Sequence, residues 1–257
     1  MAGPSRSWKR FARDWFPVAM ILVAYVLLHA VGEPLSRVAH VQPQLGFDEG
    51  ILGGTAPTVR LQRALWNGVP RWWDYGVWLV YLSHFVVSIT VAVVLWCVAY
   101  PSFRRFRTLM VSLTFAGFVT YVLYPAIPPW LASSRGDMPA TVRIVKEVWR
   151  HLGHPGIAAV FGAKSDYAFP VGALPSLHAA WPFMLALFFW PRAGRWRALL
   201  VAYVLAMAFT LVYTADHFVF DIALGWTYAT VTYVVVTRVG ARRAGDRERS
   251  PAEAVAA

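Results

Sequence analysis

The hydrophobic positions of this chain form long apolar runs, which short polar and arginine-rich segments separate. Six of these runs lie at residues 15–31, 76–99, 108–127, 174–191, 197–214 and 217–237. An α-helix needs about 20 predominantly apolar residues to cross the hydrocarbon core of a bilayer. The pattern therefore predicts an all-α, polytopic integral membrane protein with about six transmembrane helices.

The composition agrees with this pattern and excludes several functions. Hydrophobic residues make up 58% of the chain and charged residues only 14%, whereas a soluble domain averages about 25% charged residues. The net charge of +11 would also suit a nucleic-acid-binding protein. However, Lys and Arg accumulate beside cytoplasmic helix ends and anionic head groups, so we expect no nucleic-acid partner. Since Cys97 is the single cysteine, neither an internal disulfide nor a cysteine-based metal site can form.

The distribution of Lys and Arg predicts the orientation in the membrane. Most of the 24 basic residues lie in the N-terminus, the 101–107 and 192–197 loops and the C-terminal tail. The remainder are spread over two much longer segments, 33–75 and 129–172. The positive-inside rule places both termini in the cytoplasm and the long segments outside. The richness in Ala, Arg and Trp is typical of a high-GC bacterium, so we expect a bacterial plasma membrane.

Two features of the N-terminal third bear on this topology. The run at 15–31 follows four basic residues, which is also the pattern of a secretory signal peptide. We expect a retained helix because bulky residues continue to the end of the run, and a cleaved signal peptide is the alternative. Trp66, Trp72 and Trp73 are typical of an aromatic belt, which suggests an amphipathic segment at the outer membrane surface.

Two polar stretches interrupt the apolar pattern, "ALPSLHAAWPF" at 173–183 and "YTADHFVFDIALGW" at 213–226. With the orientation above, the fourth run enters the membrane from outside at His178. The fifth run returns to the same side, where the sixth begins with His217 and Asp221. The topology therefore places His178, His217 and Asp221 at similar depth on the outer side.

The spacing of His217 and Asp221 suits nucleophilic or acid–base chemistry. Residues four apart share a helix face, so Asp221 can accept a proton from Nδ1 of His217 and leave Nε2 as a nucleophile or base. Ionisable groups at membrane depth are costly, and a functional role is the first expectation. Three alternatives stay open: a zinc site, polar contacts that tie the helices together, and a proton relay in a transporter.

The two stretches also carry a family resemblance. "PSLHAAW" followed by "DHFVFDIALG" resembles the second and third signature motifs of the type 2 phosphatidic acid phosphatase superfamily. More closely, the chain resembles the branch that contains inositol phosphorylceramide synthase, an inositolphosphotransferase-like group. Leu177 between Ser176 and His178, and "YPAIPPW" at 124–130, favour this branch. The resemblance covers roughly residues 108–235.

This resemblance implies a helical-bundle phosphatase or phosphotransferase core and a mechanism. His217 attacks phosphorus and forms a phosphohistidine, Asp221 orients His217, and His178 protonates the leaving oxygen and then activates the acceptor. Neither a metal nor another cofactor is expected. We therefore predict a lipid phosphotransferase that moves a phosphoryl head group, such as inositol phosphate, from a phospholipid to a lipid or glycolipid alcohol. The alternative is a phosphatase that acts on a lipid phosphate, phosphatidate or polyprenyl diphosphate, with water as the acceptor.

The chain departs from the superfamily at its first motif, a lysine followed by Arg-Pro, which is absent. We expect Lys164 and Arg135 to bind the phosphate in its place, with Arg143 and Lys146 as further available cations. Ser176 and the amides at the start of the fourth helix are expected to donate to phosphate oxygens.

Two other polar residues are secondary candidates. Asp216, beside His217, is a candidate for a polar contact. Among the remaining histidines, His84 is the one whose position in the second run allows it to face the bundle interior.

The predicted organisation has three parts. Residues 1–107 form N-terminal membrane helices with the outer aromatic segment, residues 108–238 form the catalytic membrane core, and residues 239–257 form a disordered basic cytoplasmic tail. The active site is expected at the outer membrane face.

Overall fold

The computed structural model describes residues 8–30, 32–160 and 171–255, and these ranges are almost entirely helical. The helices are α1 (Trp8–Ala30), α2 (Gly32–Arg37), α3 (Gln44–Ile51), α4 (Pro57–Leu65), α5 (Trp72–Val98), α6 (Tyr100–Leu123), α7 (Pro129–Arg135), α8 (Ile144–His151), α9 (Pro155–Val160), α10 (Leu177–Phe189), α11 (Arg197–Tyr213) and α12 (Val219–Val255). Within the described ranges, β-structure occurs only as isolated bridges.

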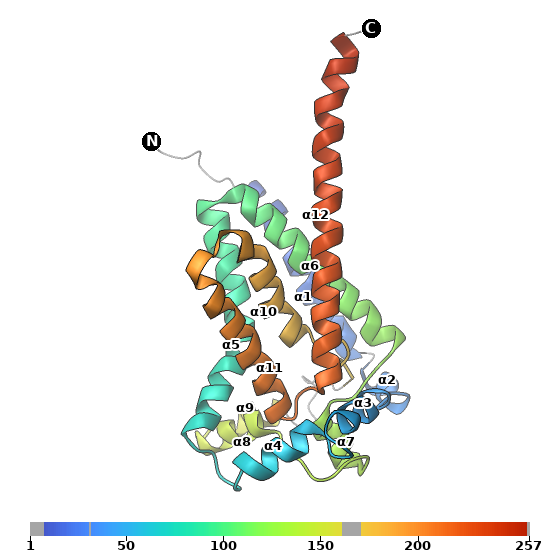
Figure 1. The fold of residues 1–257 in the computed structure, drawn as a ribbon, viewed down its shortest axis with the longest axis vertical. Helices are drawn as coiled ribbons and strands as arrows, with labels where there is room; N and C mark the ends of the chain where they lie inside the picture. The colour runs from blue at the N-terminus through green and yellow to red at the C-terminus, as the bar shows by residue number, and fades with distance from the viewer. Residues whose placement is uncertain (1–7, 31, 161–170, 256–257) are drawn as a thin grey trace.

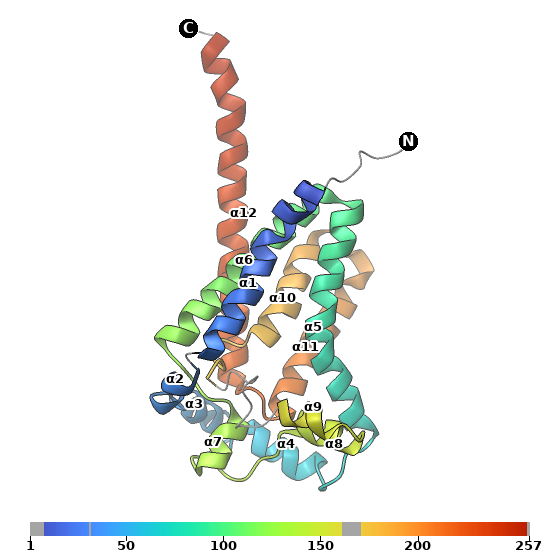
Figure 2. The same cartoon turned by 180° about the vertical axis from the view of Figure 1, so that it is seen from behind.

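The long helices stand side by side, and the short ones form a cap across one end (Figure 1). The cap consists of α2–α4 and α7–α9, while the start of α1 and the end of α12 lie at the opposite end, as the reverse view also shows (Figure 2). By length and composition, five helical segments are long and apolar enough to cross a membrane: α1, α5, α6, α12, and α11 together with the turn that precedes it (Gly194–Tyr213). The chain is thus an all-α polytopic membrane protein, as the hydrophobic pattern predicts.

The fourth predicted span is shorter than expected. The run at 174–191 folds as α10, a helix of 13 residues, which is about 20 Å long at 1.5 Å per residue. The residues before it, 171–176, are non-helical, because Pro175 disfavours helical backbone at its predecessor. Residues 173–177 are buried, so the helix begins in the interior of the protein.

The last helix is longer than expected. α12 continues to Val255 through the segment that its polar composition predicted to be a disordered tail. Ala, Arg and Glu dominate this segment, and they are strong helix formers that extend a helix already started in the membrane.

The extended segment after α6 joins the two polar stretches. Ala126 forms parallel bridges with His40 on one side and with Gly172, just before α10, on the other. Four residues later, the Trp130 amide donates to the Ala215 carbonyl at 3.1 Å, in the turn before α12. Both histidine-bearing segments are therefore held against the "YPAIPPW" stretch.

α10 lies at the centre of the bundle and packs most closely against α11 and α12, with α5 and α6 on its other sides. Its Leu177, Ala180 and Met184 belong to the main hydrophobic core, together with Phe103 and Leu113 of α6. The start of α10 is further fixed by a hydrogen bond across to α12. Packing on all sides gives α10 a defined position, although it is too short to span a bilayer.

Candidate active site

The first turn of α10 presents His178. Ser176 is the N-cap of this helix, and its hydroxyl accepts a hydrogen bond from the Ala179 amide at 3.2 Å. The Ser176 amide donates to the carbonyl of Asp221 in α12 at 3.0 Å. His178 follows as the second helical residue and is half-buried. Its position is thus tied to the start of α12.

The turn between α11 and α12 presents His217. α11 ends at Tyr213, and Ala215 adopts a left-handed backbone with φ of 63°. The amides of Asp216 and His217 then both donate to the Leu211 carbonyl, at 3.0 and 3.1 Å. This arrangement satisfies an end carbonyl of the helix and reverses the chain. It leaves the His217 side chain only 5% exposed.

Asp221 stands behind His217 in the first turn of α12. Its Oδ2 accepts a hydrogen bond from the Phe218 amide at 2.9 Å and lies 3.5 Å from Nδ1 of His217. Asp221 is fully buried. The carboxylate therefore contacts the ring nitrogen that faces away from His178, as the four-residue spacing predicts.

A second buried carboxylate, Asp48 of α3, caps the same helix end. Its two oxygens accept hydrogen bonds from the amides of Val219 and Phe220, at 2.9 and 3.1 Å. Burial raises the pKa of Asp48 to about 6, while the two amide donors oppose this rise. A carboxylate at a helix N-terminus stabilises both the helix and its entry angle. Asp48 thus helps to set the direction of the turn that carries Asp221.

The two histidines meet across the helices. Nε2 of His217 lies 3.5 Å from Nδ1 of His178, and the ring centroids are 5.5 Å apart. The structure thus brings together the three residues that the sequence placed at similar depth, in the order Asp221, His217, His178.

Aromatic and histidine rings of α5 also pack against His178. The His84 ring of α5 lies 4.2 Å from it between centroids, and the Tyr81 ring stacks on it at 5.1 Å. Trp181, one turn along α10, packs against His84 at 4.7 Å. His84 is buried, and it faces the bundle interior as its place in the apolar run suggested. These contacts restrict the orientations that the His178 ring can adopt.

A buried ion pair supplies the positive charge next to the histidines. The Arg143 guanidinium donates to Oδ1 of Asp216 from Nε at 2.8 Å and from Nη2 at 2.7 Å. It also lies 4.8 Å from the centroid of the Trp130 ring. Burial alone would lower the pKa of Arg143, but the Asp216 carboxylate raises it above its usual value. Arg143 therefore stays charged within the protein.

A cavity of about 460 Å³ connects these groups, and we call it the histidine cavity. Its polar end is formed by His84, Arg143, His178, Asp216 and His217. The rest of its wall is mostly apolar and comes from α1, α5, α6 and α10. The site thus combines a polar, reactive end with a large hydrophobic volume.

Two other predicted phosphate-binding residues, Ser176 and Arg135, lie outside the lining of the histidine cavity. The Ser176 hydroxyl caps α10 and is fully buried, and Ser176 does not line the histidine cavity. Arg135 donates from Nη2 to the carbonyl of Ser36 at 3.0 Å and also lies outside the cavity lining. Lys164 lies outside the described residues. Within the described part of the chain, the cavity-lining cation is Arg143, which the sequence offered only as one of several basic residues.

Sequence reasoning missed the roles of Arg143 and Asp48. Arg143 lies in no recognisable motif, and its one signal was the acidic Asp216 beside His217. Asp48 lies far from both motifs in a segment that looked like an outer loop. The pairing of Arg143 with Asp216 and the capping of α12 by Asp48 join residues far apart in the chain, so neither contact produces a local sequence pattern. Among the described residues, no group of three His, Cys, Asp or Glu side chains is arranged to hold a metal ion.

Comparisons with known proteins agree on one family. The family model of the PAP2 superfamily matches residues 62–235, well over half of the chain. The chain is 28% identical over 178 residues to the inositol phosphorylceramide synthase catalytic subunit of Schizosaccharomyces pombe, covering 65% of this chain and 40% of that protein. It is 24% identical over 140 residues to the phosphoinositol dihydroceramide synthase of Bacteroides thetaiotaomicron, covering 52% and 45%. The chain spans less than half the length of these relatives. No solved structure matches it significantly.

Proposed function

The chain belongs to the PAP2 superfamily, and we propose that it is a lipid phosphotransferase that works through a phosphohistidine on His217. The observation that carries this proposal is the row of Asp221, His217 and His178, of which the two histidines line the histidine cavity. Asp221 lies 3.5 Å from Nδ1 of His217, and Nε2 of the same ring faces His178 at 3.5 Å.

In the first step, the lone pair of Nε2 of His217 forms a bond to phosphorus. The bond from phosphorus to the lipid oxygen breaks, and His178 gives its proton to this leaving oxygen. Asp221 holds the proton on Nδ1 and stabilises the positive charge that develops on the ring. A diacylglycerol leaves, and the phosphoryl group with its head group stays on His217.

In the second step, an alcohol oxygen attacks phosphorus while His178 takes the alcohol proton. The bond from phosphorus to nitrogen breaks and frees His217. A distance of 3.5 Å is too short for a phosphoryl group to fit between the two nitrogens, so the rings separate when substrate binds. The rings of Tyr81 and His84 pack against one side of His178, so its ring moves toward the open volume of the histidine cavity, which it lines.

Arg143 takes the role of the missing lysine and arginine motif. A guanidinium stabilises phosphate oxygens through charge and paired donors, and these interactions are stronger in a buried site. Its ion pair with Asp216, the residue next to His217, fixes it beside the nucleophile. Asp216 thus acts as a positioning residue for this cation.

The names of the relatives favour an inositol phosphate donor and a long-chain alcohol acceptor. The shape of the site also favours transfer over hydrolysis, since a large apolar cavity suits a lipid acceptor better than water. Hydrolysis of a lipid phosphate by the same residues is the outcome to test against.

The test uses purified protein with a phospholipid that carries its radiolabel in the head-group phosphate. We expect label on the wild-type protein after a non-acidic quench, and none on His217→Ala. A His178→Gln variant should still be labelled by a donor with a good leaving group, which needs no proton, but it should then release the label slowly. Labelling of His217→Ala would refute the nucleophile.

Product analysis then identifies the acceptor. Wild-type protein incubated with donor and a ceramide-like or glycolipid alcohol should form a labelled lipid product. Release of only water-soluble phosphate or head-group phosphate would assign the chain as a phosphatase.

A further inference from the structure

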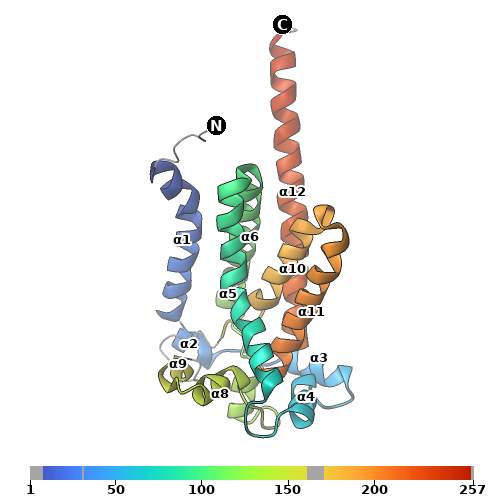
Figure 3. The ribbon, with the colours of Figure 1, turned by 90° about the vertical axis from the view of Figure 1, so that its left-hand side faces the viewer.

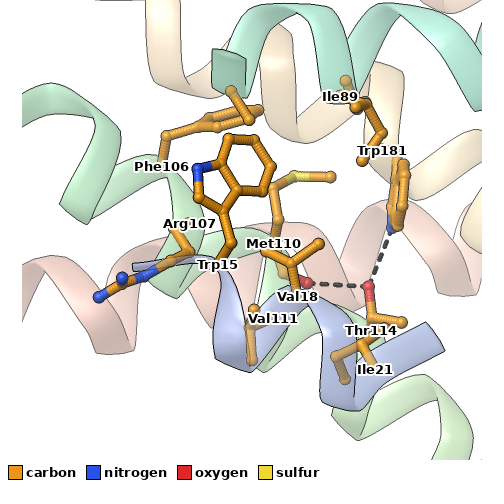
Figure 4. A pocket seen from close by; sticks show the side chains of 12 residues that line it. Trp15, Val18, Ile21, Ile89, Phe106, Arg107, Met110, Val111, Thr114 and Trp181 are labelled. Atoms are coloured by element: carbon orange, nitrogen blue, oxygen red, sulfur yellow. Dashed lines mark hydrogen bonds between the residues drawn. The ribbon is translucent and has the colours of Figure 1, made fainter. Parts of the chain in front are cut away.

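A second, smaller pocket adjoins the histidine cavity, and Figure 4 shows the side chains that line it. Its lining extends toward the starts of α1 and α6, away from the cap. The pocket has a volume of about 40 Å³ and lies among α1, α5, α6 and α10. Ile21, Ile89, Thr114 and Trp181 line both spaces, so the two are neighbours along one path. We call the two spaces together the slot.

The slot is long and apolar on the side of the histidines that faces away from the cap. Along α6 its lining residues run from Tyr121 to Phe106, which is about 22 Å of helix at 1.5 Å per residue. Along α1 they run from Tyr25 to Trp15, or about 15 Å. The polar groups at the junction are satisfied, because Trp181 donates to the Thr114 hydroxyl at 3.2 Å and this hydroxyl donates to a backbone carbonyl (Figure 4). The slot is thus suited to hydrocarbon.

The slot is bounded by α1 on the membrane side. α1 stands at one flank of the bundle, with α5 and α6 between it and the α10–α12 group (Figure 3). It packs along α6. Where α1 faces α5, the lining residues Leu22, Tyr25, Phe85 and Ile89 are all more than a third exposed. The slot therefore opens between α1 and α5 toward the surface that lipid covers.

The other end of α1 is anchored. The buried carboxylate of Asp14 accepts hydrogen bonds from Tyr100 at 2.9 Å and from Trp96 at 3.2 Å. Arg107 donates to the Asp14 carbonyl at 2.7 Å. These contacts fix the first turns of α1 to α5 and α6, and they leave its cap-side half to border the opening.

We propose that the slot binds one hydrocarbon chain of the lipid substrate, which enters between α1 and α5 and extends from the histidines toward the Asp14 anchor. This inference rests on the proposed function for the placing of the phosphate. Because bilayer lipid is as apolar as the slot, the slot contributes position more than affinity. A chain seated in it fixes the depth of its phosphate next to His217, which favours reaction.

The test is photo-crosslinking with a phosphatidate that carries a diazirine near the end of one acyl chain, on full-length protein in lipid nanodiscs. Surrounding lipid labels exposed positions such as Phe115 of α6, which is 62% exposed. Phe106 and Met110 of the same helix are 1% and 9% exposed and line the slot. We expect label on Phe106 and Met110 as well as on Phe115. Label on Phe115 alone would overturn the proposal.

A matched pair of variants controls this result. Ile21→Trp fills the junction of the two spaces from α1, while Met20→Trp places the same ring on the neighbouring exposed position, outside the slot lining. Ile21→Trp should reduce label on Met110 by at least about tenfold, because the larger side chain occupies the space at the junction and excludes the hydrocarbon chain. Met20→Trp should change it by less than about twofold. Equal effects of the two variants would refute the slot as the binding site.

Turnover separates this inference from the proposed function. Ile21→Trp should lower turnover of a long-chain donor and spare a short-chain donor with the same head group. A short chain ends within the histidine cavity and does not reach the tryptophan introduced at position 21. If the protein forms no phosphoenzyme with any donor, the proposed function is refuted. The crosslinking pattern would still show whether the slot binds a hydrocarbon chain. An active enzyme whose Ile21→Trp variant loses both donors equally would overturn the slot alone.

Discussion

Gly225 in α12 offers the sharpest test of how the two histidine-bearing segments are held together. A Cβ added there would overlap the carbonyl oxygen of Ser176 and lie 3.2 Å from its carbon. The neighbour is backbone and cannot rotate away. Gly225→Ala therefore has to push the start of α10 away from α12, the pair that carries His178 and His217.

Gly240 in the same helix provides the matched control, because a Cβ there has nothing within 4 Å. Both substitutions gain up to about 1 kcal/mol from the helix propensity of alanine. Only Gly225→Ala adds an overpacking cost, which is about 1–3 kcal/mol. The difference in unfolding free energy between the two variants isolates this clash, so we expect Gly225→Ala to be less stable than Gly240→Ala by about 1–3 kcal/mol.

The effect on activity should exceed the effect on stability. Restoring normal contact at Gly225 requires a shift on the order of 1 Å, and a misplacement of about 1 Å of reacting groups can cost on the order of 100-fold in rate. We expect Gly225→Ala to retain about 1% of wild-type turnover and Gly240→Ala to retain all of it.

The assay combines denaturant unfolding in detergent micelles, followed by tryptophan fluorescence, with turnover of the labelled phospholipid. If Gly225→Ala matched Gly240→Ala in both stability and turnover, the close approach of α12 to Ser176 would not exist. A loss of stability without a loss of turnover would show that this approach does not set the geometry of the histidines.

Substitutions at three further residues test other contacts. Arg143→Lys keeps the buried charge but loses paired donation, so kcat/KM should fall about 10- to 100-fold, whereas Arg143→Met should also destabilise the fold by about 3–5 kcal/mol. Asp48→Asn removes a carboxyl whose pKa is about 6 in the native state against 3.8 in the reference state. Ionising it costs native stability as the pH rises through 4 to 6, so wild type should lose about 2 kcal/mol relative to this variant between pH 4 and pH 7. Tyr213→Phe removes the 2.6 Å hydrogen bond to the buried Asp74 carboxylate and should cost about 1.5–3 kcal/mol in unfolding free energy.

Each of these has a result that would contradict it. Equal stability of Arg143→Lys and Arg143→Met would show that the charge of the ion pair is dispensable. A stability difference between wild type and Asp48→Asn that does not change with pH would mean that Asp48 keeps its ordinary pKa. Tyr203→Phe, which loses a hydrogen bond to the Ser83 hydroxyl at 2.8 Å, is the neutral control for Tyr213→Phe. It should cost only about 0.5–1.5 kcal/mol, and an equal loss in both would argue against a charged acceptor.

The local pattern of the chain was sufficient for the membrane class and for most helices. Crossing a bilayer depends on the length and hydrophobicity of one segment, so five of the predicted spans coincide with helices long enough to cross a membrane. The spacing of His217 and Asp221 and the topology count also brought His178 to the same place. These inferences need only helix periodicity and the side on which each segment ends.

The same reasoning failed where neighbours decide the outcome. Pro175 accounts for the late start of α10, but the bridge from Gly172 to Ala126 and the helices that enclose α10 are contacts that residues 174–191 do not reveal by themselves. The expected donation from Ser176 to a phosphate stays a prediction, and in the structure its hydroxyl accepts a hydrogen bond as the N-cap of α10. The expected role of Arg135 in phosphate binding remains a prediction that its contact with Ser36 does not favour.

The sequence by itself determined that this protein is a helical membrane protein of the PAP2 type with a paired-histidine motif, because hydrophobic length and motif spacing are local properties. Only the tertiary structure decided which cation faces the histidines, which carboxylate caps α12, and that α1 borders a long apolar slot. Arg143 and Asp216 are 73 positions apart, and Asp48 and Val219 are 171 apart. Contacts between such distant residues arise from the packing of whole helices, and they leave no periodic trace along the chain.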